Sequence, residues 1–153
     1  MNIRNKSGTI LMAEDDPDDC LLTQEAFEES QLTNDLRFVQ DGEELLDYLH
    51  RRGKFTQPTL APWPSLILLD LNMPRKDGRE VLKELKDDPH LCQIPVIILT
   101  TSQSDEDIIY SYNLGANSFI TKPVTFDGLV NVMKILGQYW FDTVILPPSP
   151  SGI

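Results

Sequence analysis

The chain has 153 residues, which suits one domain with its own hydrophobic core. Its 24 acidic and 13 basic residues give a formal charge of −11, and this sign disfavours direct binding of nucleic acid. No segment approaches the ~18 apolar residues of a membrane span, and Cys20 and Cys92 form neither a disulfide framework nor a metal-binding spacing. We therefore expect a cytoplasmic protein that makes no membrane contact.

Five short apolar runs, which alternate with segments of helical periodicity, are the predicted strands. Three of the runs are apolar without alternation, which is typical of strands covered on both faces in a parallel sheet. The pattern predicts an α/β fold of the doubly wound (βα)5 type, with one parallel five-stranded sheet and helices on both faces. In chain order the predicted strands are residues 9–13, 36–40, 66–71, 94–100 and 118–121.

Pairs of residues typical of helix N-termini precede several of the predicted helices. One is an acid followed by proline, which reads as an N-cap and first helical position, and two have the spacing of a capping box. These pairs are Asp16 with Pro17, Asp41 with Glu44, and Ser104 with Asp107.

Two segments lie outside the alternating pattern. Residues 51–64 are long and rich in proline, so they predict an exposed loop, with Trp63 packing it against the domain. Residues 139–146 are aromatic and β-branched, and they either pack on their own domain as a strand or contact a partner.

We divide the chain into an N-terminal tail (1–8), one domain (9–138) and a C-terminal extension (139–153), and expect no output domain after residue 137.

Acidic side chains follow two of the predicted strands directly. Glu14 and Asp15 come after the first strand, and Asp70 and Asn72 come at the end of the third. Carboxyl ends of parallel strands meet at one edge of a sheet, so these side chains are expected to converge. Two carboxylates ~4 Å apart repel by ~4 kcal/mol at an effective dielectric of ~20, which a bound cation would relieve. The oxygen ligands favour Mg²⁺.

A hydroxyl and an ammonium group are expected at the same edge. Thr100 ends the fourth predicted strand, and Lys122 follows the fifth, directly before Pro123. Asp70 stands alone on its strand end, so it is the predicted nucleophile for a phosphoryl group, with Mg²⁺ and Lys122 compensating the charge. Asp16 is predicted to be a helix cap, and its part in the metal site is left open.

With these residues in place, the chain resembles the receiver domains of two-component response regulators over about residues 9–138. The resemblance implies a flavodoxin-like fold, Asp70 as phosphoacceptor, Asp15 as direct metal ligand, Glu14 as a water-mediated one, and a metal bond from the Asn72 backbone carbonyl. The motifs that carry it are ILMAEDDPDD, LILLDLNMPRKDG, PVIILTTS and GANSFITKPV.

The resemblance also implies roles for residues at the last two strands. Thr100 would bind the phosphoryl group after a loop shift, Lys122 would contact it ionically, and the bond between Lys122 and Pro123 would be cis. Phe119 falls at the aromatic switch position, where it lacks the hydroxyl of a tyrosine, and Glu14 replaces the more common aspartate. Neither departure removes a required group.

The function implied is that of a single-domain response regulator. A sensor histidine kinase would phosphorylate Asp70, and the chain would assist its own phosphorylation and dephosphorylation without acting as an enzyme on another substrate. The EDDPDD opening, the long loop and the YWFDTVILP segment resemble the small response regulators of cyanobacterial phytochromes, which implies a phytochrome kinase.

The signal is expected to leave by protein contact, through a downstream target or a homodimer. The fourth predicted helix offers a contact surface together with residues 139–146, because Tyr110 and Tyr112 cannot both face inward with Ile108 and Ile109.

Two other classes of protein share part of this pattern. A haloacid-dehalogenase-like phosphatase also uses an aspartate and Mg²⁺, but its D-x-D motif lies near the N-terminus and its second acid pair comes late, where this chain has only Lys122 and Pro123. A phosphorylation-independent pseudo-receiver lacks the acceptor or the metal site, and this sequence retains both.

Overall fold

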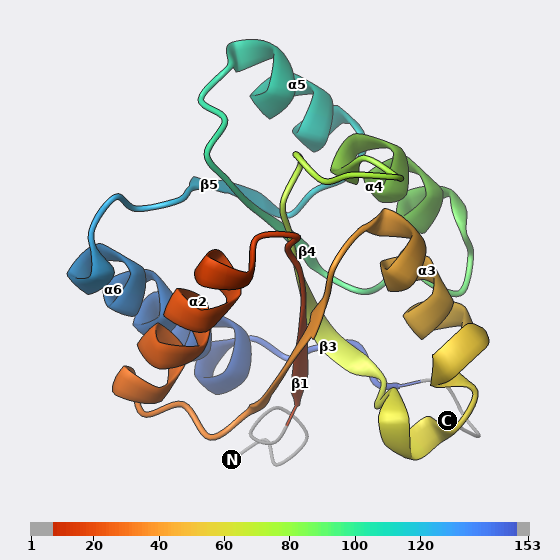
Figure 1. The fold of residues 1–153 in the computed structure, drawn as a ribbon, viewed down its shortest axis with the longest axis horizontal. Helices are drawn as coiled ribbons and strands as arrows, with labels where there is room; N and C mark the ends of the chain where they lie inside the picture. Colours follow the sequence, from red (N-terminus) through yellow and green to blue (C-terminus); the bar gives the residue numbers. More distant parts are fainter. Residues whose placement is uncertain (1–7, 150–153) are drawn as a thin grey trace.

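The computed structural model describes residues 8–149 and has one parallel sheet of five strands (Figure 1). The strand order β2-β1-β3-β4-β5 places β1 and β3 side by side at the centre. This arrangement confirms the predicted doubly wound, flavodoxin-like fold. Of the predicted tails, residues 1–7 and 150–153 lie outside the described residues. The strands are β1 (Thr9–Ala13), β2 (Asp35–Val39), β3 (Pro64–Leu69), β4 (Val96–Thr100) and β5 (Ser118–Thr121).

Helices cover both faces of the sheet (Figure 1). Strand side chains alternate between the faces, so Ile10 and Met12 join one core cluster while Leu11 and Ala13 join the other. Among residues 8–149, no helix combines the length and the apolar character that crossing a bilayer requires. On one face lie α2 (Pro17–Glu29) and α6 (Phe126–Gly137), and on the other α3 (Gly42–His50), α4 (Gly78–Asp87) and α5 (Asp105–Asn113).

The predicted N-caps are confirmed, but each of the two predicted capping boxes forms only the hydrogen bond to the cap side chain. The Asp41 side chain accepts from the Glu44 amide at 2.8 Å, whereas the Glu44 carboxylate accepts from the Gln40 amide, one residue before the cap. The Ser104 hydroxyl accepts from the Asp107 amide at 3.3 Å, and the Asp107 carboxylate turns away to other partners.

The proline-rich loop before β3 is largely exposed, as predicted, and contains two short 3-10 helices, η1 (Gly53–Phe55) and η2 (Pro58–Leu60). The Tyr48 hydroxyl donates to the Pro62 carbonyl at 2.6 Å, and Trp63 packs half-buried against the core. These contacts hold the loop on the α3 side of the sheet.

The residues after α6 pack on their own domain, and they do so as a helix. The π-helix η3 (Gln138–Thr143) continues α6 without a break, because Gly137 and Gln138 both keep right-handed helical dihedral angles. Phe141 and Leu146 are buried in the cluster beneath α2 and α6. The expectation of a strand is therefore wrong, and the large apolar side chains left exposed in this segment are Tyr139 and Ile145.

Candidate functional site

The three predicted metal ligands with carboxylate side chains meet at the carboxyl edge of the central strands. Glu14 and Asp15 follow β1, and Asp70 follows its neighbour β3, where the Asp70 amide donates to the Ala13 carbonyl at 3.2 Å. One carboxylate oxygen from each acid lies within 4.8 Å of the other two. Glu14 and Asp70 are buried and Asp15 is exposed. Such a set of hard oxygen donors, open to solvent on one side, could hold a divalent cation.

Lys122 reaches into this cluster from the end of β5. Its Nζ donates to Glu14 Oε1, to Asp70 Oδ2 at 3.1 Å and to Asp19 Oδ2 at 3.0 Å. Asp19, in the first turn of α2, was missed by the sequence analysis, although it belongs to the same acidic motif as Asp15. The lysine therefore neutralises part of a cluster of four carboxylates.

The expectation of a cis bond between Lys122 and Pro123 is wrong. No peptide bond within residues 8–149 is cis. The trans form is the intrinsically preferred isomer for a bond before proline. In this form Lys122 makes its contacts with the acid cluster, so those contacts do not require the cis isomer.

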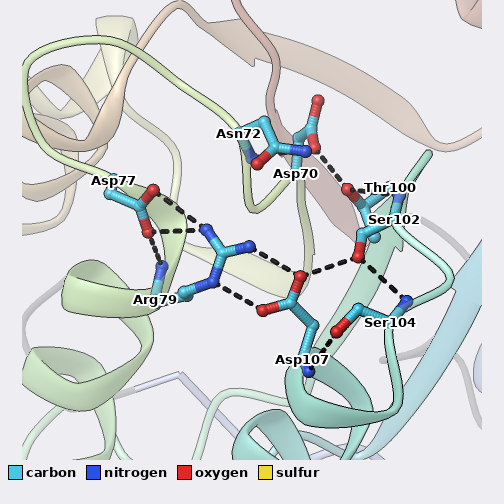
Figure 2. Close-up of polar contacts among 8 residues, drawn as sticks. All are labelled: Asp70, Asn72, Asp77, Arg79, Thr100, Ser102, Ser104 and Asp107. Atoms are coloured by element: carbon cyan, nitrogen blue, oxygen red, sulfur yellow. Dashed lines mark hydrogen bonds and ion pairs between the residues drawn. The ribbon is translucent and has the colours of Figure 1, made fainter.

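Both carboxylate oxygens of Asp70 are occupied by donors (Figure 2 shows the Thr100 side). The fully buried Thr100 donates its hydroxyl to Oδ1 at 2.8 Å, and the Asn72 amide donates to the same oxygen at 3.2 Å. Lys122 donates to Oδ2. Thr100 thus contacts the Asp70 carboxylate directly in this structure.

Burial and charge shift the pKa values of the two central partners. Burial raises the pKa of Glu14 to about 7; the hydrogen bond from Lys122 opposes this shift, and the charge of Asp70 adds to it. Burial alone would lower the pKa of Lys122, but its hydrogen bonds to Glu14 and Asp19 hold the pKa above its ordinary value. Lys122 is therefore a fixed positive charge beside Asp70.

The start of α4 lies directly against the backbone of Asp70 and Leu71. The Gly78 amide donates to the Leu71 carbonyl at 3.0 Å, and a Cβ built on Gly78 would lie 2.3 Å from the Asp70 carbonyl oxygen. Gly78 thus makes a close backbone approach that leaves no room for a side chain.

Other predicted residues lie around the site without touching the acid cluster through their side chains. Phe119 is half-buried against the core on the α3 side, and its amide donates to the Tyr112 hydroxyl at 3.2 Å. The Asp16 carboxylate caps α2 by accepting from the Asp18 amide. Asp16 is therefore a helix cap in this structure.

Three comparisons identify the kind of protein to which this arrangement belongs. Residues 10–145 match the family described as response regulator receiver domain. Response regulator Rcp1 of Synechocystis sp. is 40% identical over 145 residues, which are 95% of this chain and 97% of that protein.

Solved structures agree with the family match. Response regulator RPA3017, which acts in red light signaling of R. palustris, has a TM-score of 0.88 and 40% identity, covering 93% of this chain and 99% of that chain. The phosphorylated cyanobacterial phytochrome response regulator RcpA has a TM-score of 0.85 and 42% identity, with the same coverages of 93% and 99%. A Mn²⁺-bound form of Rcp1 has a TM-score of 0.82 and 40% identity, covering 92% of this chain and 99% of that chain.

Proposed function

The chain belongs to the response regulator receiver domain family, and from this premise we propose that Asp70 is its phosphoacceptor. The observation that carries the proposal is the set of groups around the Asp70 carboxylate. Glu14 and Asp15 lie on one side, and the Thr100 hydroxyl and the Lys122 ammonium contact its two oxygens. An attacking carboxylate needs this combination of anchoring donors and positive charge.

In the proposed reaction, an Asp70 oxygen attacks the phosphorus of a phosphohistidine on a sensor histidine kinase. The P–N bond breaks as the P–O bond forms, and the leaving imidazole takes up a proton. Lys122 stays charged and faces the phosphoryl oxygens, while Thr100 donates its hydroxyl proton to one of them. A divalent cation, which we propose to be Mg²⁺, would be held by Glu14, Asp15, Asp70 and the Asn72 carbonyl, and would compensate the phosphoryl charge.

The relatives support a phytochrome-type kinase as the donor. RcpA is a phytochrome response regulator, and RPA3017 acts in red light signaling. Receiver-domain response regulators are in general signalling proteins, so we propose that this chain assists its own phosphorylation and dephosphorylation in the cytoplasm and turns over no separate substrate.

The phosphatase and pseudo-receiver alternatives are not favoured, because the family match covers residues 10–145 and both Asp70 and the acid cluster are present.

We further propose that the signal leaves through a protein target or a homodimer formed by the α5 face. This face presents Ile109, Tyr110 and Tyr112, which are 60%, 42% and 48% exposed. Because each copy carries a charge of −11, an association of two copies has to be chiefly apolar.

The acceptor assignment is tested by labelling with a phosphorylated kinase or a small acyl phosphate. The substitution Asp70→Asn removes the nucleophilic carboxylate in nearly the same shape, so we expect labelling to be lost while circular dichroism shows an unchanged fold. The matched control is Asp87→Asn, at an exposed aspartate of α4, which should be labelled like the parent chain. Substantial labelling of the Asp70→Asn chain would contradict the assignment.

A further inference from the structure

A charged pair ties the first turn of α4 to the first turn of α5 (Figure 2). Arg79 donates from Nε to Asp107 Oδ1 at 2.8 Å and from Nη2 to Asp107 Oδ2 at 2.7 Å, a bidentate geometry. Asp77, the N-cap of α4, accepts from Arg79 Nη1 at 3.0 Å and from the Arg79 amide at 2.7 Å. The guanidinium is therefore held from two sides and has little freedom to move.

The same pair is connected to the acceptor through the loop between β4 and α5. Ser102 donates its hydroxyl to Asp107 Oδ2 at 2.7 Å, and its amide approaches Thr100 Oγ1 at 3.5 Å. Thr100 in turn donates to Asp70 Oδ1. Figure 2 shows this path from Arg79 to Asp70, with each step an interaction between neighbouring groups.

Ser102 is the point at which this loop is attached to the domain. It is half-buried, whereas Thr101, Gln103 and Ser104 are exposed. Its hydroxyl donates to Asp107 and also accepts from the Ser104 amide at 3.3 Å. The position of Ser102 thus depends on Asp107. The Thr100 hydroxyl oxygen faces the Ser102 amide, so the hydroxyl proton of Thr100 is directed at Asp70.

We propose that Arg79 is a positioning residue for phosphoryl transfer at Asp70. By holding Asp107, and through it Ser102, it keeps the Thr100 hydroxyl directed at the acceptor and at the phosphoryl group that the acceptor receives. This inference rests on the proposed function of Asp70 and extends it to a residue that touches neither the acid cluster nor Thr100.

A competing explanation for any effect of Arg79 is its positive charge, which would attract a phosphoryl group at a distance. Two variants separate the explanations. Arg79→Gln makes the chain one charge more negative, and Asp107→Asn makes it one charge less negative. If Arg79 acts by positioning the Thr100 hydroxyl, a small acyl phosphate should label both variants roughly threefold to tenfold more slowly than the parent chain. An effect of charge alone would change the two rates in opposite directions and would overturn the proposal.

Arg37→Gln is the matched control. It removes an arginine with the same change in charge, from an ion pair with Asp35 at 2.7 Å on strand β2 at the edge of the sheet. We expect this variant to be labelled at the parent rate. A decrease equal to that of Arg79→Gln would show that loss of a positive charge, and not positioning, causes the effect.

The link to Thr100 is tested by a double-mutant cycle. If Arg79 acts through Thr100, then Arg79→Gln should lower the labelling rate in the parent chain but change it little in a chain that carries Thr100→Val. Full additivity of the two substitutions would overturn the proposed path.

A second measurement keeps this inference separate from the acceptor assignment. If the parent chain is not labelled at all, the proposed function fails, and the path is then tested by amide hydrogen exchange without any phosphoryl donor. Arg79→Gln should accelerate exchange of the Ser102 and Ser104 amides, and Arg37→Gln should not. Unchanged exchange at Ser102 and Ser104 would overturn the positioning role.

Discussion

Asp15 and Asp16 are adjacent acids after β1 with different neighbours. The Asp15 carboxylate belongs to the cluster with Glu14 and Asp70, whereas the Asp16 carboxylate accepts from the Asp18 amide at the start of α2. Two identical side chains at consecutive positions thus have different surroundings, one in an acid cluster that could hold a cation and one in a helix cap.

This difference predicts the response of cation binding to substitution. Asp15→Asn should weaken Mg²⁺ binding by roughly tenfold or more, because it removes a ligand charge. Asp16→Asn should change the affinity much less, and since asparagine is also a good N-cap, it should leave α2 intact. Calorimetric titration of both variants with Mg²⁺ measures the effects. If Asp16→Asn weakened Mg²⁺ binding more than Asp15→Asn, Asp16 and not Asp15 would be the cation ligand.

At the scale of single residues, the sequence was sufficient to predict which strand ends bring their side chains together. Glu14, Asp70 and Lys122 each follow a strand, and strand ends are set by the backbone fold. Asp19 and Arg79 were missed because their contacts depend on side-chain directions across two elements, which no local pattern encodes. The bond before Pro123 was also not predictable, because the two isomers differ by only ~0.5–1 kcal/mol.

Helix α4 is placed by a backbone contact that leaves no room for a side chain. Gly78 occupies its first turn, where a Cβ would lie 2.3 Å from the Asp70 carbonyl oxygen and 2.7 Å from the Leu71 Cα. Both contacts involve backbone atoms, which cannot move aside as the end of a flexible side chain could.

We therefore predict that Gly78→Ala destabilises the protein by about 1–3 kcal/mol. Helix propensity alone would give the opposite sign, a gain of up to about 1 kcal/mol in the free energy of unfolding. Urea unfolding of the two chains measures the difference. A variant as stable as the parent, or more stable, would show that the contact between α4 and the backbone of Asp70 and Leu71 is not tight.

At the scale of elements, local patterns predicted where strands and helices exist better than where they end. The fourth strand begins two residues later than predicted, at Val96, because the Ile94 amide donates to the Leu91 carbonyl in a turn and Pro95 has no amide. Residues 139–146 have the composition of a strand, but α6 continues into them and buries Phe141 and Leu146. Tertiary packing outweighs local β propensity in this segment.

The whole molecule combines a strongly acidic surface with exposed apolar side chains on α5. We predict a concentration-dependent dimer that becomes stronger with added salt, since salt screens the repulsion between two chains of charge −11. Ile109→Glu should reduce the dimer fraction strongly in sedimentation experiments.

Ile145→Glu is the matched control for this surface. It makes the same change at an isoleucine that is 75% exposed on the segment after α6. It should leave the dimer unchanged. If Ile145→Glu reduced the dimer fraction and Ile109→Glu did not, the interface would lie on the C-terminal segment. A parent chain that stays monomeric at high micromolar concentration would rule out the homodimer.

Chemical trapping would show directly whether Asp70 carries the phosphoryl group. The parent chain is incubated with Mg²⁺ and a phosphoryl donor, treated with borohydride, which reduces an aspartyl phosphate to homoserine, and mapped by peptide mass spectrometry. We predict homoserine at Asp70 and unchanged Glu14, Asp15 and Asp19. Reduction at one of those three acids, with Asp70 intact, would contradict this prediction.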